Sequence, residues 1–291
     1  MDTLTIIGCG KVGKTLGLLL HRGRVLALQQ VLNRSPESAA AAVDFIGAGA
    51  SASGYEDLLP ADYIMVAASD AALPACAAGL ARSRAIHPGT IVFHCSGAQP
   101  AAVLAAVKER GALVASVHPI KSFADPTLAA ASFQGTYCGL EGEAGAGEKL
   151  EPIFKAIGAR LFRLEPSCKL VYHAGTVFAS NYLTALVEAS LRCYERAGIP
   201  RPQALEMLLP IFEGTLQNNR QLGPARALTG PIARGEEQLV QHQLAAVEKW
   251  DFRLGGVYRA LGLLALELSA VQGSAPAPAL EQIKRALASP R

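Results

Sequence analysis

Apolar and polar positions alternate in blocks along the first half of the chain. Short apolar runs such as "LTIIG", "DYIMVAAS" and "TIVFHCSG" are each followed by a segment with helical spacing, and "ALVASVHP" is a further run of this kind. Runs without a polar residue at every second position are typical of strands covered on both faces of a parallel sheet. We therefore predict a doubly wound α/β domain, which "TYCGLEG" and "ARLFRL" extend by two strands.

The pattern changes after Leu164. From Pro166 onward the chain shows only helical stretches, which are broken at "GIPRP", "LGPARALTGPIARG" and "QGSAPAPA". Clusters of glycine and proline of this kind mark the ends of helices and the loops between them. We place a domain boundary at Glu165–Pro166, which divides an α/β domain, residues 1–165, from an all-α domain, residues 166–291.

Composition narrows the classes of protein that remain open. Of the 291 residues 51% are hydrophobic, and the formal net charge is +3, so the chain can bury a core and lacks the basic surplus of nucleic-acid binders. The longest uninterrupted apolar runs are too short to span a membrane, and the first strand begins too early for a cleavable signal. The six cysteines show no pairing and no zinc spacing. We expect a cytoplasmic protein without a metal, nucleic-acid or membrane partner.

The first strand is followed by "GCGKVG", a G-x-G-x-x-G motif that opens a predicted helix. In this context Gly8 permits the tight turn, Gly10 lets the backbone approach a pyrophosphate, and Gly13 allows close packing of helix and strand. The N-terminus of the helix offers unpaired N–H groups to the phosphates. The alternative is a strand–helix turn that holds no ligand. The residues between the glycines complete the predicted cofactor loop: Cys9, Lys11 and Val12.

The end of the second predicted strand indicates which dinucleotide the loop prefers. A site for NAD usually has an acidic residue here for the ribose 2′-hydroxyl, but none occurs between Asp2 and Glu37. The strand instead ends in Asn33, Arg34 and Ser35. A planar guanidinium pairs well with a 2′-phosphate, and the two polar neighbours can donate hydrogen bonds. We therefore predict NADP as the cofactor, with an arginine that is merely solvated as the alternative.

Polar or small residues also end three later strands, where ligands bind in open α/β sheets. Ala68, Ser69 and Ser96 are expected to line the nicotinamide-ribose side of the cofactor. Asp70 fits a helix N-cap better than a ligand. His118 is a candidate for substrate binding, although a histidine hydrogen-bonded within a loop is an equally good interpretation.

The first predicted helix of the second domain carries polar residues on an otherwise apolar surface. At 100° per residue, Lys169, His173 and Ser180 lie within about 40° of one another, and Asn181 lies about 120° from the lysine. Burial of such a stripe is costly unless it lines a wet, ligand-filled cleft. A lysine there can have a lowered pKa and serve as a general acid or base. The alternative is a lysine in water with the other residues satisfied between helices.

A bent connection at "ALTGPIARGEEQL" is a second candidate for the cleft. Thr229 and Arg234 could both be presented by this loop, and the arginine could hold an anionic group of the substrate. An ordinary turn between helices with a solvated arginine is the alternative.

Taken together, "GCGKVG", "NRS", "HCSGA", "HPIKSF", "KLVYHAGTVFASNYL" and "ALTGPIARGE" resemble the Rossmann-like family whose helical C-terminal half is a DUF2520 domain. The resemblance runs from about Thr3 to Val247. The family is similar in layout to 6-phosphogluconate dehydrogenase, 3-hydroxyacid dehydrogenase, ketopantoate reductase and pyrroline-5-carboxylate reductase. It implies NADP binding, an all-helical second domain and a homodimer formed through that domain. The long apolar helix 253–271 would suit a subunit interface or a core equally well.

The resemblance also bears on catalysis. In the hydroxyacid dehydrogenases a lysine on the first helix after the nucleotide-binding domain is the acid/base, and an asparagine follows one turn later. Lys169 occupies a comparable place, but His173 stands one turn on and Asn181 follows twelve residues later. These three are the candidate catalytic residues, and the proton donor is either of the first two.

We expect an NADP(H)-dependent oxidoreductase that transfers hydride to a small polar C=O or C=N substrate. In this hypothesis Ser180 helps to orient the substrate, and Arg234 binds its anionic group. The alternative is a non-catalytic NADP-binding sensor or assembly protein.

Overall fold

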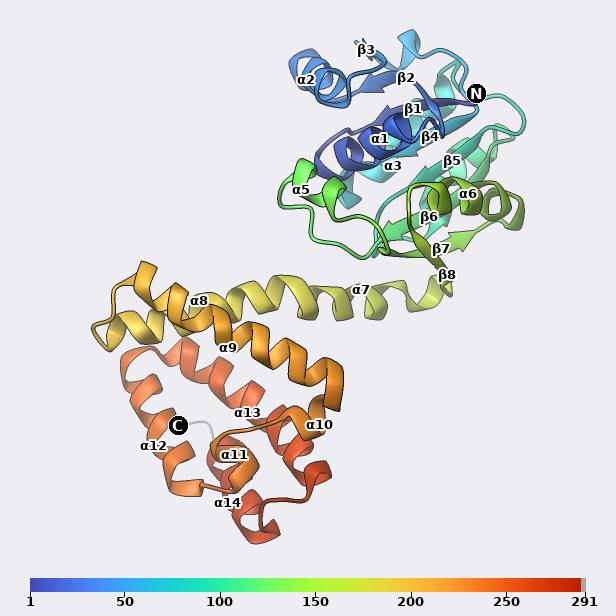
Figure 1. The fold of residues 1–291 in the computed structure, drawn as a ribbon. Helices are drawn as coiled ribbons and strands as arrows, with labels where there is room; N and C mark the ends of the chain where they lie inside the picture. Colours follow the sequence, from blue (N-terminus) through green and yellow to red (C-terminus); the bar gives the residue numbers. More distant parts are fainter. Residues whose placement is uncertain (289–291) are drawn as a thin grey trace. The chain divides into compact units, whose positions relative to one another are not determined.

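The computed structural model describes residues 1–288 of the chain. By their internal contacts the residues form two compact units, Met1–Asn181 and Tyr182–Arg291, and each is described by itself. The first contains the sheet and the second is a set of helices (Figure 1).

One eight-stranded sheet forms the centre of the first unit. Its strands are β1 (Thr3–Ile7), β2 (Ala27–Leu32), β3 (Ala50–Ala52), β4 (Tyr63–Val66), β5 (Ile91–His94), β6 (Leu113–Pro119), β7 (Tyr137–Gly142) and β8 (Arg160–Arg163). They lie in the order β3-β2-β1-β4-β5-β6-β7-β8, and only the β6–β7 pair is antiparallel. The strand order changes direction beside β1, as in doubly wound sheets. The predicted α/β class and the two additional strands are confirmed.

Helices cover both faces of this sheet (Figure 1). The helices of this unit are α1 (Lys11–Arg22), α2 (Pro36–Ile46), α3 (Leu73–Arg82), α4 (Ala105–Lys108), α5 (Pro126–Ala131), α6 (Ala144–Ala156) and α7 (Lys169–Val177). One core packs α1, α2 and α6 against the sheet around Leu16, Phe93 and Phe154. A second core on the other face packs α3 and α4 around Leu73 and Val92. Because both faces are buried, the strands are apolar without alternation.

Local sequence signals set the ends of several helices. The N-cap of α2 is Ser35, whose hydroxyl accepts a hydrogen bond from the Ser38 amide, and Pro36 occupies the first helical position. The helix ends at Gly47, whose φ of 81° is left-handed, a conformation that favours glycine. Asp125 caps α5 in the same way by accepting from the Leu128 amide.

Helices are the only regular secondary structure in the described part of the second unit, residues 182–288, so the predicted all-α class of the C-terminal region is confirmed. Its helices are α8 (Leu183–Arg196), α9 (Arg201–Leu222), α10 (Pro224–Ala227), α11 (Pro231–Arg234), α12 (Glu237–Trp250), α13 (Phe252–Gln272) and α14 (Ala277–Ala288). Val240, Leu266 and Ile283 form a core between α12, α13 and α14. A smaller core around Leu191 and Leu208 joins α8 to α9.

Helix α13 exposes much of its apolar surface. Within the described residues it is the one helix that is long and apolar enough to cross a membrane, which is weak evidence because core helices pass the same test. Gly262 and Leu266 are buried in this unit, so one side of α13 packs against its neighbours. Exposed apolar side chains of the helix are Phe252, Val257, Leu261, Leu264 and Val271.

The division between the units lies later in the chain than the boundary expected at Glu165–Pro166. Helix α7 belongs with the sheet unit, which extends to Asn181. At the start of α7 the Lys169 side chain is buried among residues of the sheet. A π-helical segment, Phe178–Tyr182, follows α7 and contains the division.

Candidate active site

The glycine loop has the backbone geometry that the motif predicts. Gly8 has a φ of 76°, and a Cβ there would lie 2.7 Å from the backbone of Ala68 at the end of β4. A Cβ on Gly10 would meet nothing within 4 Å, so open space lies above this peptide. Gly10 is the N-cap of α1, and no side chain caps the helix. The first N–H groups of α1 therefore remain available to an anion.

One of the three residues at the end of β2, Asn33, stabilises this loop. The Cys9 amide donates to Oδ1 of Asn33 at 2.6 Å, and Nδ2 of Asn33 donates to the Ser38 carbonyl at 2.9 Å. Ser35 caps α2. Arg34 is exposed, and within residues 1–288 no hydrogen bond or ion pair holds its guanidinium. The Cys9 side chain is buried, so a cofactor could contact this residue only through its backbone.

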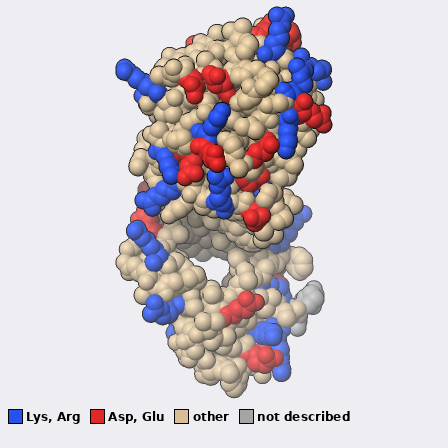
Figure 2. Space-filling model, turned by 90° about the vertical axis from the view of Figure 1, so that its right-hand side faces the viewer, with Lys and Arg blue, Asp and Glu red and all other residues tan. Residues whose placement is uncertain are grey.

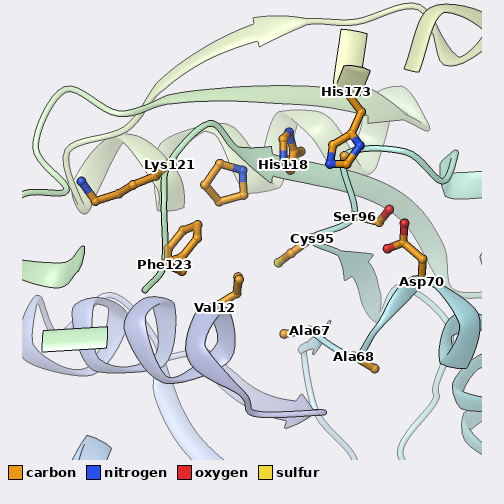
Figure 3. Close-up of a pocket in the computed structure, with 12 residues that line it drawn as sticks. Val12, Ala67, Ala68, Asp70, Cys95, Ser96, His118, Lys121, Phe123 and His173 are labelled. Atoms are coloured by element: carbon orange, nitrogen blue, oxygen red, sulfur yellow. The ribbon is translucent and has the colours of Figure 1, made fainter. Parts of the chain in front are cut away.

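A pocket of about 220 Å³ lies next to the glycine loop, at the carboxyl ends of the strands (Figure 3). Its walls come from the start of α1, the ends of β4, β5 and β6, and α7, all in the first unit. Five predicted site residues meet in it: Val12, Ala68, Ser96, His118 and His173. The sheet topology thus brings together cofactor and substrate candidates from positions far apart in the sequence.

Asp70 also lines the pocket, whereas we expected it to cap a helix. The cap position of that short 3₁₀ helix, Asp70–Ala72, belongs to Ser69, which is exposed. In Figure 3 the carboxyl group of Asp70 lies near Ser96. The pocket therefore has a carboxylate at its edge that the sequence did not assign to it.

Two histidines converge on the Ser96–Gly97 loop. A Cβ on Gly97 would lie 2.4 Å from the His173 ring and 2.7 Å from the His118 ring, so glycine is needed there for both rings to approach. The ring centroids are 5.6 Å apart. Nδ1 of His118 lies 2.8 Å from the hydroxyl of Tyr172. Burial, followed by the charges of His173 and Lys169, lowers the pKa of His118 to about 4.

The side chain of Lys169, at the start of α7, is held by residues of the sheet and does not line the pocket. Only 1% of the residue is exposed. Its Nζ donates to Ser116 Oγ at 2.6 Å and to the Ser96 carbonyl at 3.2 Å, and it lies 3.3 Å from Oε1 of Glu141. Burial lowers the pKa of Lys169, and the Glu141 carboxylate opposes that shift. Of the two proton-donor candidates, His173 is therefore the one that α7 presents to the pocket.

Other predicted site residues lie outside this pocket. Ser180 and Asn181 are exposed in the π-helical segment, where the geometry of 100° per residue no longer holds. In the second unit Thr229 is exposed between α10 and α11. Both oxygens of Glu236 accept hydrogen bonds from the Arg234 guanidinium, at 2.8 and 2.9 Å. Only some of the residues predicted to bind cofactor or substrate therefore meet in this pocket of the first unit.

Sequence reasoning missed several residues of this site. A glutamate inside the apolar run "TYCGLEG" was a usable signal, because a buried carboxylate requires a partner, and Glu141 has one in Lys169. Tyr172 and Gly97 gave no signal of their own, since their roles depend on contacts across the fold. Among the described residues, no group of three or more His, Cys, Asp or Glu side chains could hold a metal ion. On the face drawn in Figure 2, positive and negative residues are interspersed.

Family comparisons assign the two parts of the chain. A family model for the Rossmann-like domain matches residues 2–119, and one for DUF2520, a domain of unknown function, matches residues 136–265. The chain therefore combines a Rossmann-like domain with a DUF2520 domain, and the resemblance stated above is confirmed. No protein in the curated collection matches it.

Solved structures share this fold at low sequence identity. An NADP oxidoreductase-like protein from Bacteroides fragilis is 19% identical with a TM-score of 0.77, over 91% of this chain and 98% of that one. Protein TM1727 from Thermotoga maritima is 23% identical with a TM-score of 0.71, over 93% and 99%. Pyrroline carboxylate reductase from Plasmodium falciparum, solved with NADP bound, is 12% identical with a TM-score of 0.58, over 99% and 98%. At these identities the comparison establishes the fold.

Proposed function

We propose that the protein is an NADP(H)-dependent oxidoreductase that reduces a small polar C=O or C=N substrate by hydride transfer. The observation that carries this proposal is the position of the pocket. Val12, in the glycine loop, and the two histidines line the same cavity of about 220 Å³. A dinucleotide whose phosphates lie on the N-terminus of α1 would therefore extend toward His118 and His173.

The residues of the loop fit a dinucleotide. Open space above Gly10 and the uncapped start of α1 suit a pyrophosphate. Arg34 suits a 2′-phosphate because its side chain is exposed just after β2. The end of β2 also lacks the acidic residue that would bind the ribose 2′-hydroxyl of NAD. The Plasmodium falciparum reductase of the same fold has NADP bound, which supports this choice of cofactor.

The dinucleotide, when bound, supplies the hydride, and the chain supplies orientation and a proton. In this proposal His173 donates the proton to the reduced oxygen or nitrogen, and bulk solvent returns a proton to the ring. Lys169 is a positioning residue, because it fixes the Ser96 carbonyl in the loop that the histidines contact. Lys121 also lines the pocket, but its Nζ donates to the Ser132 carbonyl at 2.8 Å, and Arg234 is held by Glu236. Either cation would have to leave its present partner to bind an anionic substrate group.

The choice of cofactor can be tested by thermal unfolding. A ligand that binds only the folded state, at a concentration of a hundred times its Kd, stabilises that state by about 2.7 kcal/mol. Because the tighter ligand stabilises more, NADPH should raise the Tm more than NADH does at equal concentration. Arg34→Ala should lower NADPH affinity about 10- to 100-fold, the effect of losing a charge-assisted hydrogen bond, and leave NADH unchanged. Arg84→Ala, an exposed arginine outside the loop, is the matched control. Equal stabilisation by both dinucleotides would contradict the assignment.

Turnover can be tested with a panel of keto acids, ketones and cyclic imines, followed through oxidation of NADPH. His173→Ala should abolish turnover of any substrate found and leave NADPH binding intact. A variant that turns over normally would remove His173 from the mechanism. Tight binding of NADPH without any turnover would favour a sensor or assembly protein.

We also propose that the protein forms a homodimer through its helical unit. Support comes from α13, which exposes Leu261, Leu264 and Val271 while its opposite side packs within the unit. Apolar surface of this extent on a helix is typical of an interface with a second chain. A second copy is the occupant that the DUF2520 resemblance implies.

A further inference from the structure

The pair formed by Tyr172 and His118 bears on which substrates the pocket can take. The hydroxyl of Tyr172 lies 2.8 Å from Nδ1 of His118, and the two rings meet edge to face with centroids 5.5 Å apart. Tyr172 also contacts Phe162 on β8, and its hydroxyl lies close to Gly139 on β7. The position of the phenol is therefore set by the sheet and not by the histidine alone.

A hydrogen bond between a phenol and an imidazole has two possible directions. A phenol O–H is a strong donor, whereas the phenol oxygen is a weak acceptor, and an unprotonated imidazole nitrogen is a strong acceptor. The favoured arrangement therefore has Tyr172 donating to Nδ1 of His118. A neutral imidazole carries one proton, so that proton must then lie on Nε2.

Nε2 of the His118 ring lies against Gly97 in the pocket wall. A Cβ on Gly97 would come within 2.7 Å of this atom, and Gly97 and His118 both line the pocket. Figure 3 shows His118 and His173 at the same side of the cavity. The low pKa of His118, about 4, keeps the ring uncharged near neutral pH, so the donor does not become a cation.

We propose that Tyr172 fixes the tautomer of His118 so that Nε2–H is a permanent donor to an oxygen atom of the substrate, which selects a carbonyl over a protonated imine. This rests on the proposed function and deepens it. A carbonyl oxygen has lone pairs that accept from Nε2–H, and it gains negative charge as hydride arrives at carbon. An iminium nitrogen has no free lone pair and presents its own N–H, so it would face a donor where it needs an acceptor.

The electrons and protons of this reduction balance without a further reactant. The hydride brings two electrons to the carbonyl carbon, the C=O π bond becomes a lone pair on oxygen, and the proton from His173 completes the alcohol. His118 keeps its proton throughout and stabilises the oxyanion by a hydrogen bond. Asp70 is the carboxylate of the pocket that could serve an iminium instead, and its contribution is an outcome of the test.

The tautomer can be read directly by NMR of the whole protein with ¹⁵N-labelled histidine near pH 7, with His118→Asn used to assign the signal. We expect a single neutral Nε2–H form in the wild type. Tyr172→Phe should convert it to an averaged mixture of tautomers, and Tyr137→Phe, which removes an exposed hydroxyl on β7, should leave it unchanged. An Nδ1–H form in the wild type, or no change in Tyr172→Phe, would overturn the proposal.

The selectivity is tested with two five-membered rings. Cyclopentanone carries a C=O group, and 1-pyrroline has a C=N bond within its ring. We expect NADPH oxidation at least tenfold faster with the ketone, and a loss of about tenfold in kcat for Tyr172→Phe with little change in KM. Faster reduction of the imine, with dependence on Asp70 and not on Tyr172, would overturn the selectivity. If neither compound is reduced while the Nε2–H form is observed, the donor assignment stands and the hydride-transfer proposal fails.

Discussion

At the scale of single residues, the site depends on close approaches that only particular side chains permit. Gly97 has both histidine rings against its α-carbon, and Tyr172 holds one of these rings by its hydroxyl. Neither glycine nor tyrosine stands in a motif with an obvious chemical role. Their importance arises from what lies across from them, and substitution should therefore act through the histidines.

Gly97→Ala should displace the histidine rings. The added methyl would lie 2.4 Å from the His173 ring and 2.7 Å from that of His118, so both must move or the loop must shift. Overpacking of this kind costs about 1–3 kcal/mol. Denaturant unfolding should show that loss, and the His118 NMR signal should change. Gly175→Ala, on α7 where a Cβ meets nothing within 4 Å, is the control, and equal behaviour of the two variants would contradict the close approach.

The buried histidines should make the fold sensitive to mild acid. Burial, and then the charge of Lys169, lowers the pKa of His94 to about 4. Burial, and then the charges of His173 and Lys169, lowers the pKa of His118 to about 4 as well. The Asp70 carboxylate opposes both shifts. Between pH 6.5 and 4 the unfolded chain binds protons that the folded chain excludes. The free energy of unfolding should therefore decrease as the pH is lowered through this range, by about 1.4 kcal/mol per pH unit for each histidine.

Urea unfolding at several pH values measures this slope. His118→Asn should remove about half of the histidine contribution over the same window and leave the behaviour above pH 7 unchanged. A free energy of unfolding that stays constant between pH 6.5 and 4.5 would show that these rings are already protonated or solvated in the folded protein.

At the scale of elements, a buried ion pair is among the contacts that fix α7 to the sheet. Lys169 lies 3.3 Å from Glu141 on β7, and both side chains are almost fully buried. Removal of one partner leaves a buried charge unpaired, which costs about 3–5 kcal/mol. Lys169→Met should therefore destabilise the protein by that amount, and the double variant Lys169→Met/Glu141→Gln should recover much of it.

The measurement is denaturant unfolding of the single and double variants as a mutant cycle. Lys155→Met, which breaks an exposed pair with Glu151, should cost less than about 1 kcal/mol. If Lys169→Met proves as mild as this control, the lysine is solvated and α7 is not anchored by it.

The same element shows what the sequence could and could not predict. Apolar runs and glycine spacing were sufficient for the sheet and the phosphate loop, because both depend on local chemistry. The helical stripe correctly indicated that Lys169 and His173 face inward. Periodicity does not say how far inward, so the buried lysine was taken for a pocket residue, and the contacts of Glu141 and Tyr172 required the folded sheet. Ser180 lies in a π-helical segment, where the angular spacing assumed for the stripe does not apply.

At the scale of the whole molecule, the remaining prediction concerns assembly. Leu264 is 54% exposed on α13 in a helix with several other exposed apolar residues. If a second copy covers this surface, the mass in solution should be about twice the 30.4 kDa of one chain. Leu264→Glu should give the monomer mass, because a charge buried in an apolar interface without a partner is strongly unfavourable.

Light scattering after size exclusion provides the mass, and circular dichroism confirms that the variant remains folded. Leu128→Glu is the matched control, since Leu128 is 71% exposed on α5 in the sheet unit and should leave the dimer intact. A wild-type chain that is monomeric at micromolar concentration would refute the dimer. Loss of the dimer in both variants would place the interface on the sheet unit as well, because only a surface that includes α5 would respond to the control.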